Sequence, residues 1–209
     1  MDLKRVMVER RAVNFFDPAK PVSDAELKKL VETASYTPSG FNLQPWQLIV
    51  VKSNDDKERL KAVAWGQPKI TEAPIVLILL ADRDGWKAGH PVVEKVWQNM
   101  VELGYMKPEE RDMFEGGAKF LYDGNEKSLS FAVKNASFFG LALMLAAKDT
   151  GLDTHPMDGF DHEGVRKAFD IPDNFFVPLI LAVGHFNEQY KLMPPKWRKS
   201  YDEIIWKEY

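Results

Sequence analysis

The chain has 209 residues, 45% of them hydrophobic, which suits one large domain or one domain with insertions. A formal net charge of −3 does not favour nucleic-acid binding, and the absence of cysteine excludes disulfides, thiol nucleophiles and zinc–thiolate sites. The sequence shows no signal peptide and no run of about 18 apolar residues, so we expect a cytoplasmic protein without a membrane partner.

The first 80 residues predict alternating helices and buried strands. Apolar residues at helical spacing predict helices over residues 2–9, 24–36 and 55–63. Ser23 and Glu26 form a capping box that begins the second helix. Continuous apolar runs predict strands over 47–51 and 75–80, and strands of this kind indicate a sheet that is covered on both faces.

The rest of the chain predicts an irregular segment, a long helix and one more strand. Residues 84–125 contain a helical pattern over 92–103 and another beginning at Pro108, and we interpret the segment as an insertion or lid. The pattern over 127–150 is apolar on almost every side, which is typical of a helix in the core or at a subunit interface. A strand over 176–183 completes the expected elements of a single domain.

Residues 37–46 form a polar loop between the second helix and the first strand. Prolines and a glycine separate the two elements, and Ser39, Asn42 and Gln44 bring short hydrogen-bonding side chains to this junction. Such a loop can present donors and acceptors to a flat polar ligand. These residues fit equally well an ordinary loop closed by a buried tryptophan.

Basic residues gather near both ends of the chain. Arg10 and Arg11 follow the first helix, where they can cap its carbonyls or clamp a phosphate. Lys196 and Arg198 lie in the tail. On the residues alone, the plainer interpretations, helix capping and a solvated surface run, are favoured.

No familiar catalytic motif is present. The histidines lack metal-ligand spacing and are expected in loops or at the surface, namely His90, His155, His162 and His185. Gly-x-Ser-x-Gly, Gly-x-Gly-x-x-Gly and Walker motifs are absent, which disfavours serine hydrolases and classical nucleotide binding. An enzyme without an evident base or nucleophile usually relies on a cofactor for its chemistry.

Four blocks of residues, in order, carry a resemblance. They are Arg10-Arg11-Ala12-Val13-Asn14-Phe15, Pro38-Ser39-Gly40-Phe41-Asn42-Leu43-Gln44-Pro45-Trp46, Gly66-Gln67 followed by Ala73-Pro74, and Pro156-Met157-Asp158-Gly159-Phe160-Asp161 with Lys196-Trp197-Arg198 near the end. With this spacing the chain resembles the FMN-dependent nitroreductase family over nearly its full length. The resemblance reverses the plainer interpretations of the loop and the basic clusters.

The resemblance implies that four cations bind the FMN phosphate from opposite ends of the sequence. These are Arg10, Arg11, Lys196 and Arg198. The family often has a serine at the position of Ala12, where a hydroxyl would also hold phosphate. This chain therefore departs from the family pattern at one phosphate contact.

The remaining cofactor contacts implied by the resemblance surround the flavin. Ser39 and Asn42 would contact the flavin and its ribityl chain, with Pro38 packed nearby, and Gln67 would hydrogen-bond the ring. The backbone of Met157, Asp158 and Gly159 would pass close to flavin N5, which a residue without a side chain permits.

The second departure concerns charge near the pyrimidine end of the flavin. The family often has a cation at the position of Asn14, which stabilises the negative charge of reduced flavin. Asn14 can hydrogen-bond but cannot neutralise, and Lys69 is the candidate to supply the charge instead.

The resemblance further implies an α+β fold with a central, mostly antiparallel sheet surrounded by helices, and an intertwined homodimer with FMN at the interface. The implied reaction is ping-pong hydride transfer from NAD(P)H to nitroaromatics, quinones or similar conjugated acceptors. The sequence leaves open a specialised flavoprotein of the same fold that dehalogenates its substrate or remodels flavin. It also leaves open a flavin-binding sensor or store, and a dimeric scaffold without a cofactor.

Overall fold

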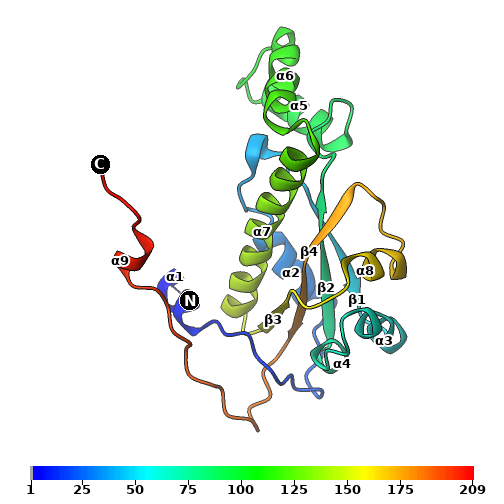
Figure 1. Ribbon diagram of the computed structural model, residues 1–209, viewed down its shortest axis with the longest axis vertical. Coiled ribbons are helices and arrows are strands. Elements are labelled where there is room, and N and C mark those ends of the chain that lie inside the picture. Colours follow the sequence, from blue (N-terminus) through cyan, green and yellow to red (C-terminus); the bar gives the residue numbers. More distant parts are fainter. Residues whose placement is uncertain (1) are drawn as a thin grey trace.

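The computed structural model, which describes residues 2–209, is built on a central antiparallel sheet. Within that range the sheet has four strands in the order β1-β2-β4-β3 (Figure 1). The strands are β1 (Trp46–Val51), β2 (Ile75–Asp82), β3 (Asp153–Met157) and β4 (Phe175–Gly184). The predicted α+β class and antiparallel sheet are confirmed.

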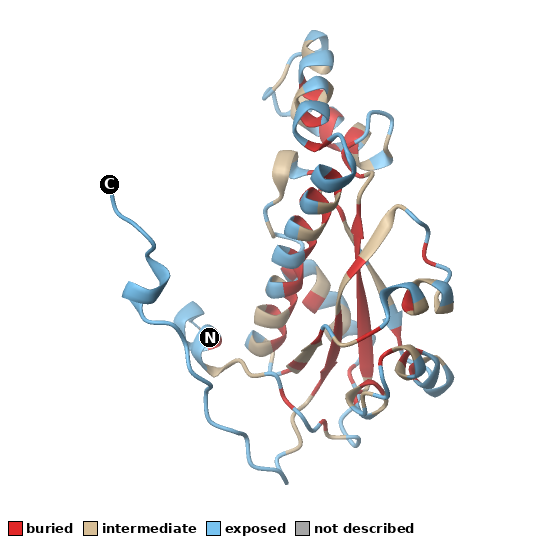
Figure 2. Cartoon of the chain, viewed as in Figure 1, coloured by how far each residue is buried: buried red, intermediate tan, exposed pale blue. Residues whose placement is uncertain are grey.

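Helices cover both faces of the sheet, as the apolar strands predict. Every residue of β2 is buried, and its side chains alternate between two hydrophobic clusters (Figure 2). The helices are α1 (Leu3–Glu9), α2 (Asp24–Ala34), α3 (Asn54–Val63), α4 (Lys69–Glu72), α5 (Pro91–Glu102), α6 (Arg111–Tyr122), α7 (Asn125–Asp149), α8 (His162–Ala168) and α9 (Tyr201–Ile204), with 3₁₀ turns η1 (Gly40–Asn42) and η2 (Pro108–Glu110). One cluster lies under α2, α5, α6 and α7, and the other lies under α3, α4 and α8.

The long helix α7 is the element that most other parts of the chain contact. It packs on all four strands and on α2, and ten of its residues are buried. Gly140 lets it approach the sheet closely, since an added Cβ would lie 3.1 Å from Leu179 and 3.2 Å from Leu79. By length and composition alone α7 could cross a membrane, but these contacts account for its apolar character as a core helix.

Residues 84–125 form an ordered part of the main core. Their helices α5 and α6 place Val93, Trp97, Phe114 and Tyr122 in the cluster beneath α7. The interpretation of this segment as a lid stays a prediction.

Both ends of the chain form arms at one side of the protein, and α1 contacts α7 and buries Val6. Figure 1 shows α1 and the C-terminal tail with α9 near one another on one side of α7, α1 being beside the lower part of that helix, and Figure 2 shows the tail exposed. Trp206 and Tyr209 are exposed despite their size, and Leu3, Met7 and Val8 are exposed on α1. These arms carry apolar surface that nothing in residues 2–209 covers.

Candidate functional site

A cavity of about 430 Å³ lies where the two arms pass the edge of the sheet. It brings together residues far apart in the sequence. Its lining residues are Arg10, Arg11, Ala12, Val13, Asn14, Phe15, His155, Phe186, Lys191, Leu192, Met193, Pro194, Pro195, Lys196 and Arg198. Six of the predicted cofactor residues, namely Arg10, Arg11, Ala12, Asn14, Lys196 and Arg198, therefore share one cavity.

The N-terminal segment is held against the cavity by the edge strand β3. Ala12 forms a parallel bridge with Thr154, and the backbone N–H of Val13 donates to the Thr154 carbonyl at 3.0 Å. The Val13 side chain is buried, whereas Ala12 and Asn14 on either side of it are exposed. This extended alternation presents Ala12 and Asn14 to the ligand space.

The cavity gathers positive charge without a counter-charge. Five cations line it, no carboxylate does, and none of the five takes part in an ion pair within residues 2–209. Burial lowers the pKa of Arg10, and the like charges of Arg198 and Arg11 lower it further. An anion would relieve this repulsion, so the cavity fits a phosphate-bearing ligand.

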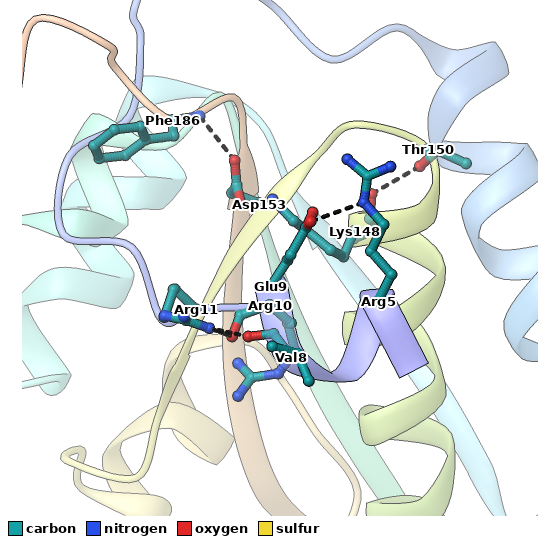
Figure 3. A network of polar contacts seen from close by, with 10 residues as sticks. Arg5, Val8, Glu9, Arg10, Arg11, Lys148, Thr150, Asp153 and Phe186 are labelled. Atoms are coloured by element: carbon teal, nitrogen blue, oxygen red, sulfur yellow. Dashed lines mark hydrogen bonds and ion pairs between the residues drawn. The ribbon is translucent and has the colours of Figure 1, made fainter. Parts of the chain in front are cut away.

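The two arginines have different partners. Arg11 turns back and donates through Nη1 to the carbonyls of Val8 and Arg10, the latter at 2.9 Å (Figure 3). This is the capping role that the helix end suggested. Its Nε is buried and unpartnered within the described chain, and the side chain of Arg10 has no hydrogen-bond partner there. Arg10 is thus the arginine with its whole guanidinium available to a ligand.

Residues predicted to contact the flavin ring adjoin the end of β3. The Gln67 side chain donates through Nε2 to the Gly159 carbonyl at 2.7 Å, which leaves its Oε1 to accept from a ligand. An added Cβ at Gly159 would lie 3.0 Å from that Nε2 and 3.3 Å from the Trp65 ring. Met157 is buried and Asp158 is exposed, so Met157 can contribute only backbone to a ligand.

The central loop is not part of this cavity. Pro38, Ser39 and Asn42 are absent from its lining, and in Figure 1 η1 lies beside the upper half of α7, whereas α1 lies beside the lower end. The loop conformation is unusual because Phe41 and Asn42 both have φ of 56°. A single chain therefore does not bring the loop and the arginines together.

A buried asparagine holds the central loop in place. Asn135 of α7 is 1% exposed, accepts from the Gly40 N–H at 3.0 Å and donates to the Phe131 carbonyl at 2.6 Å. Within the loop, the Ser39 hydroxyl accepts from the Gln44 N–H at 2.9 Å, which leaves its own proton for a ligand.

His155 is a cavity residue that sequence reasoning missed. Its Nδ1 lies 2.7 Å from the Val13 carbonyl, and burial, followed by the charges of Lys69 and Lys196, lowers its pKa. The effect of Lys69 on His155 places that lysine close to the same cavity. The available signal was its position two residues before Met157, since alternate residues of a strand share a face.

Comparisons with known proteins agree with this geometry. The family model described as the nitroreductase family matches residues 7–185. The chain belongs to the nitroreductase family.

Relatives of this nitroreductase-family chain match it along almost their full lengths. The Bacillus subtilis protein MhqN, which bears the provisional name NAD(P)H nitroreductase, is 30% identical over 94% of each chain. An enone reductase of Lactiplantibacillus plantarum is 29% identical over 88% of this chain and 85% of its own.

Solved structures of the family share the fold. The Bacillus subtilis nitroreductase-type protein YdfN superposes with a TM-score of 0.89 and 29% identity, covering 99% of this chain and 97% of its own. A nitroreductase-type protein from Exiguobacterium sibiricum, solved in complex with FMN, has a TM-score of 0.84 at 23% identity and covers 99% of this chain and 98% of its own.

Proposed function

We propose that the protein is an FMN-dependent oxidoreductase that transfers hydride from NAD(P)H to conjugated acceptors. The observation that carries the proposal is the cavity with five cations and no carboxylate, built from the arginine block and the tail of a nitroreductase-family chain. The FMN complex of a protein with the same fold and the NAD(P)H in a relative's name support the same cofactors.

Each part of the cavity has a role in this proposal. Arg10, Lys196 and Arg198 hold the phosphate, because they converge without carboxylates. Asn14 would lie near the pyrimidine end of the flavin, where Lys69 of α4, which is outside the cavity lining, is the candidate to supply positive charge. When bound, FMN supplies the hydride chemistry, and the protein positions donor and acceptor in turn against one ring face.

The backbone at the end of β3 and Gln67 orient the ring. The Gln67 side chain is fixed by its bond to the Gly159 carbonyl, so its Oε1 would be held ready to accept a hydrogen bond from the flavin. Gly159 offers no side chain between ring and backbone. A fixed acceptor of this kind costs little entropy when the ligand binds.

The acceptor belongs to a class of flat conjugated molecules. One relative is named an enone reductase and another an NAD(P)H nitroreductase, so both names concern conjugated, electron-poor groups. Nitroaromatics, quinones and enones are the acceptors we expect. A ping-pong order follows if donor and acceptor use the same ring face.

A homodimer would complete the site. The Ser39 loop does not reach the cavity of its own chain, and α7 exposes Phe138 and Leu141, which are 49% and 43% accessible. Pairing α7 with a second copy would cover this surface and let the arms, with Trp206, wrap the partner. The loop of one chain would then supply Ser39 to the cavity of the other, in a cytoplasmic enzyme.

Purified protein tests the function directly. The account predicts a yellow protein that consumes NAD(P)H in the presence of a quinone or nitroaromatic, and that runs as a dimer by light scattering. Yellow protein without turnover on any conjugated acceptor would indicate a flavin sensor or a specialised flavoprotein. Protein that neither retains nor rebinds FMN would refute the proposal.

A further inference from the structure

His155 lines the cavity and has one ring nitrogen without a hydrogen-bond partner in the described chain. It lies on β3 opposite Ala182 and lines the cavity with Arg10 and Lys196. A carbonyl oxygen only accepts, so the 2.7 Å contact with the Val13 carbonyl requires the proton on Nδ1. Nε2 is therefore the atom that changes protonation.

The charges around His155 are all positive. Lys69 of α4 and Lys196 of the tail act on it through their charges, and Arg10, Arg11, Lys191 and Arg198 are the other cations of the cavity. The carboxylate of Asp153, two residues away on β3, is paired with Lys148 at 3.3 Å and accepts from the Phe186 N–H.

The state of His155 depends on whether an anion is present. Burial, Lys69 and Lys196 lower its pKa, against the raising effect of the Val13 hydrogen bond, so the ligand-free protein favours the neutral ring. A phosphate dianion offsets the cationic field and favours the charged imidazolium, which has a donor at Nε2.

We propose that His155 is a ligand of the cofactor in its own right, whose Nε2 takes up a proton from solvent as the FMN anion binds and then donates a hydrogen bond to it. This inference rests on the proposed function, because it needs FMN in the cavity. It makes cofactor binding proton-linked, with tighter binding as the pH falls from 8.0 to 6.5. The phosphate itself loses charge only near its second pKa of about 6 and acts in the opposite direction.

Histidine NMR of the wild-type protein tests the inference without altering the chain. The His155 signals, identified by their loss in His155→Gln, are titrated with and without saturating FMN. The inference predicts a pKa below the ordinary value of about 6.5 in the free protein and a higher one, by about a unit or more, in the complex. An unchanged or lower pKa in the complex overturns it, whereas failure to form any FMN complex refutes the proposed function instead.

Cofactor titrations provide a second, independent readout. Wild-type protein should bind FMN roughly three- to tenfold more tightly at pH 6.5 than at pH 8.0, and riboflavin, which lacks the phosphate, should show no such trend. His155→Gln keeps a donor for the Val13 carbonyl and should lose the trend. His162→Gln, an exposed histidine outside the cavity, should retain it. An equal trend in wild type and His155→Gln, or with riboflavin, overturns the inference.

Discussion

Replacing Arg10 should separate cofactor affinity from protein stability. Arg10→Gln keeps much of the apolar stem but removes the charge and the bidentate fork. Hydrogen bonds to charged groups contribute about 1.5–3 kcal/mol, and 1.4 kcal/mol is about tenfold, so the Kd for FMN should rise roughly 10- to 150-fold. Because burial and the charges of Arg198 and Arg11 already disfavour the Arg10 guanidinium, the ligand-free protein should melt at the same or a slightly higher temperature.

The assay is a flavin fluorescence titration of the ligand-free protein with FMN and with riboflavin. Riboflavin affinity should stay within about twofold of wild type, since it has no phosphate. Arg5→Gln is the matched control, because Arg5 lies on α1, just before Arg10 in the chain, but pairs with Glu9 at 2.8 Å outside the cavity. Equal losses for FMN and riboflavin, or an equal FMN loss in Arg5→Gln, would show that Arg10 does not bind the phosphate.

Four further changes have expected outcomes. Asn135→Leu leaves the half-buried Gly40 N–H unpaired and should lower the free energy of unfolding by about 1–3 kcal/mol in urea titrations; an unchanged midpoint would contradict its role. Phe138→Lys places a charge on the exposed face of α7 and should give monomers by light scattering, with weaker FMN binding; a stable FMN-loaded monomer would contradict the dimeric site. Asn14→Lys should raise the flavin midpoint potential by tens of millivolts. A unit charge at 4 Å contributes a Coulomb energy of about 4 kcal/mol, which solvent reduces to about 1 kcal/mol, and about 30 mV corresponds to 1.4 kcal/mol for two electrons. A redox titration showing no rise would mean that Asn14 does not face the flavin. The pKa of His155 is lowered in the folded protein, so its contribution to stability is complete above about pH 6.5 and is lost as the pH falls. Thermal melts of the ligand-free proteins from pH 7.5 to 5.5 should therefore show a smaller drop in melting temperature for His155→Gln than for wild type. Equal drops would contradict the lowered pKa.

Much of the fold follows from hydrophobic patterns. The three apolar runs became β1, β2 and β4, since strands buried on both faces need no alternation. The pattern missed β3, a short edge strand that contains His155 and Pro156. Proline has no N–H to donate and is tolerated at a sheet edge, so composition alone argued against a strand there.

The irregular segment concealed a core face for a different reason. In α5 and α6 the buried residues recur at helical spacing, as Val93, Val96 and Trp97 and again as Phe114 and Ala118 do. Glycines and charges between them weaken the pattern in sequence. Only their packing in the main hydrophobic cluster shows which face is buried.

The candidate site was predictable where the family resemblance covers its residues. Arg10 and Arg198 were assigned to the phosphate through the family resemblance, because on their own they fit helix capping and a solvated surface run, and the structure brings both to one cavity. Asn135 and His155 were not identified from the sequence, because their roles arise from contacts with Gly40 and Val13 that lie 95 and 142 residues away in the chain.

The most direct test of the proposed reaction separates its two halves. FMN-loaded protein is mixed with NAD(P)H without oxygen or acceptor, and the flavin absorbance is followed before and after a quinone is added. The account predicts that the yellow absorbance bleaches with one equivalent of NAD(P)H and returns with one equivalent of quinone. Flavin that stays oxidised with both NADH and NADPH would contradict it.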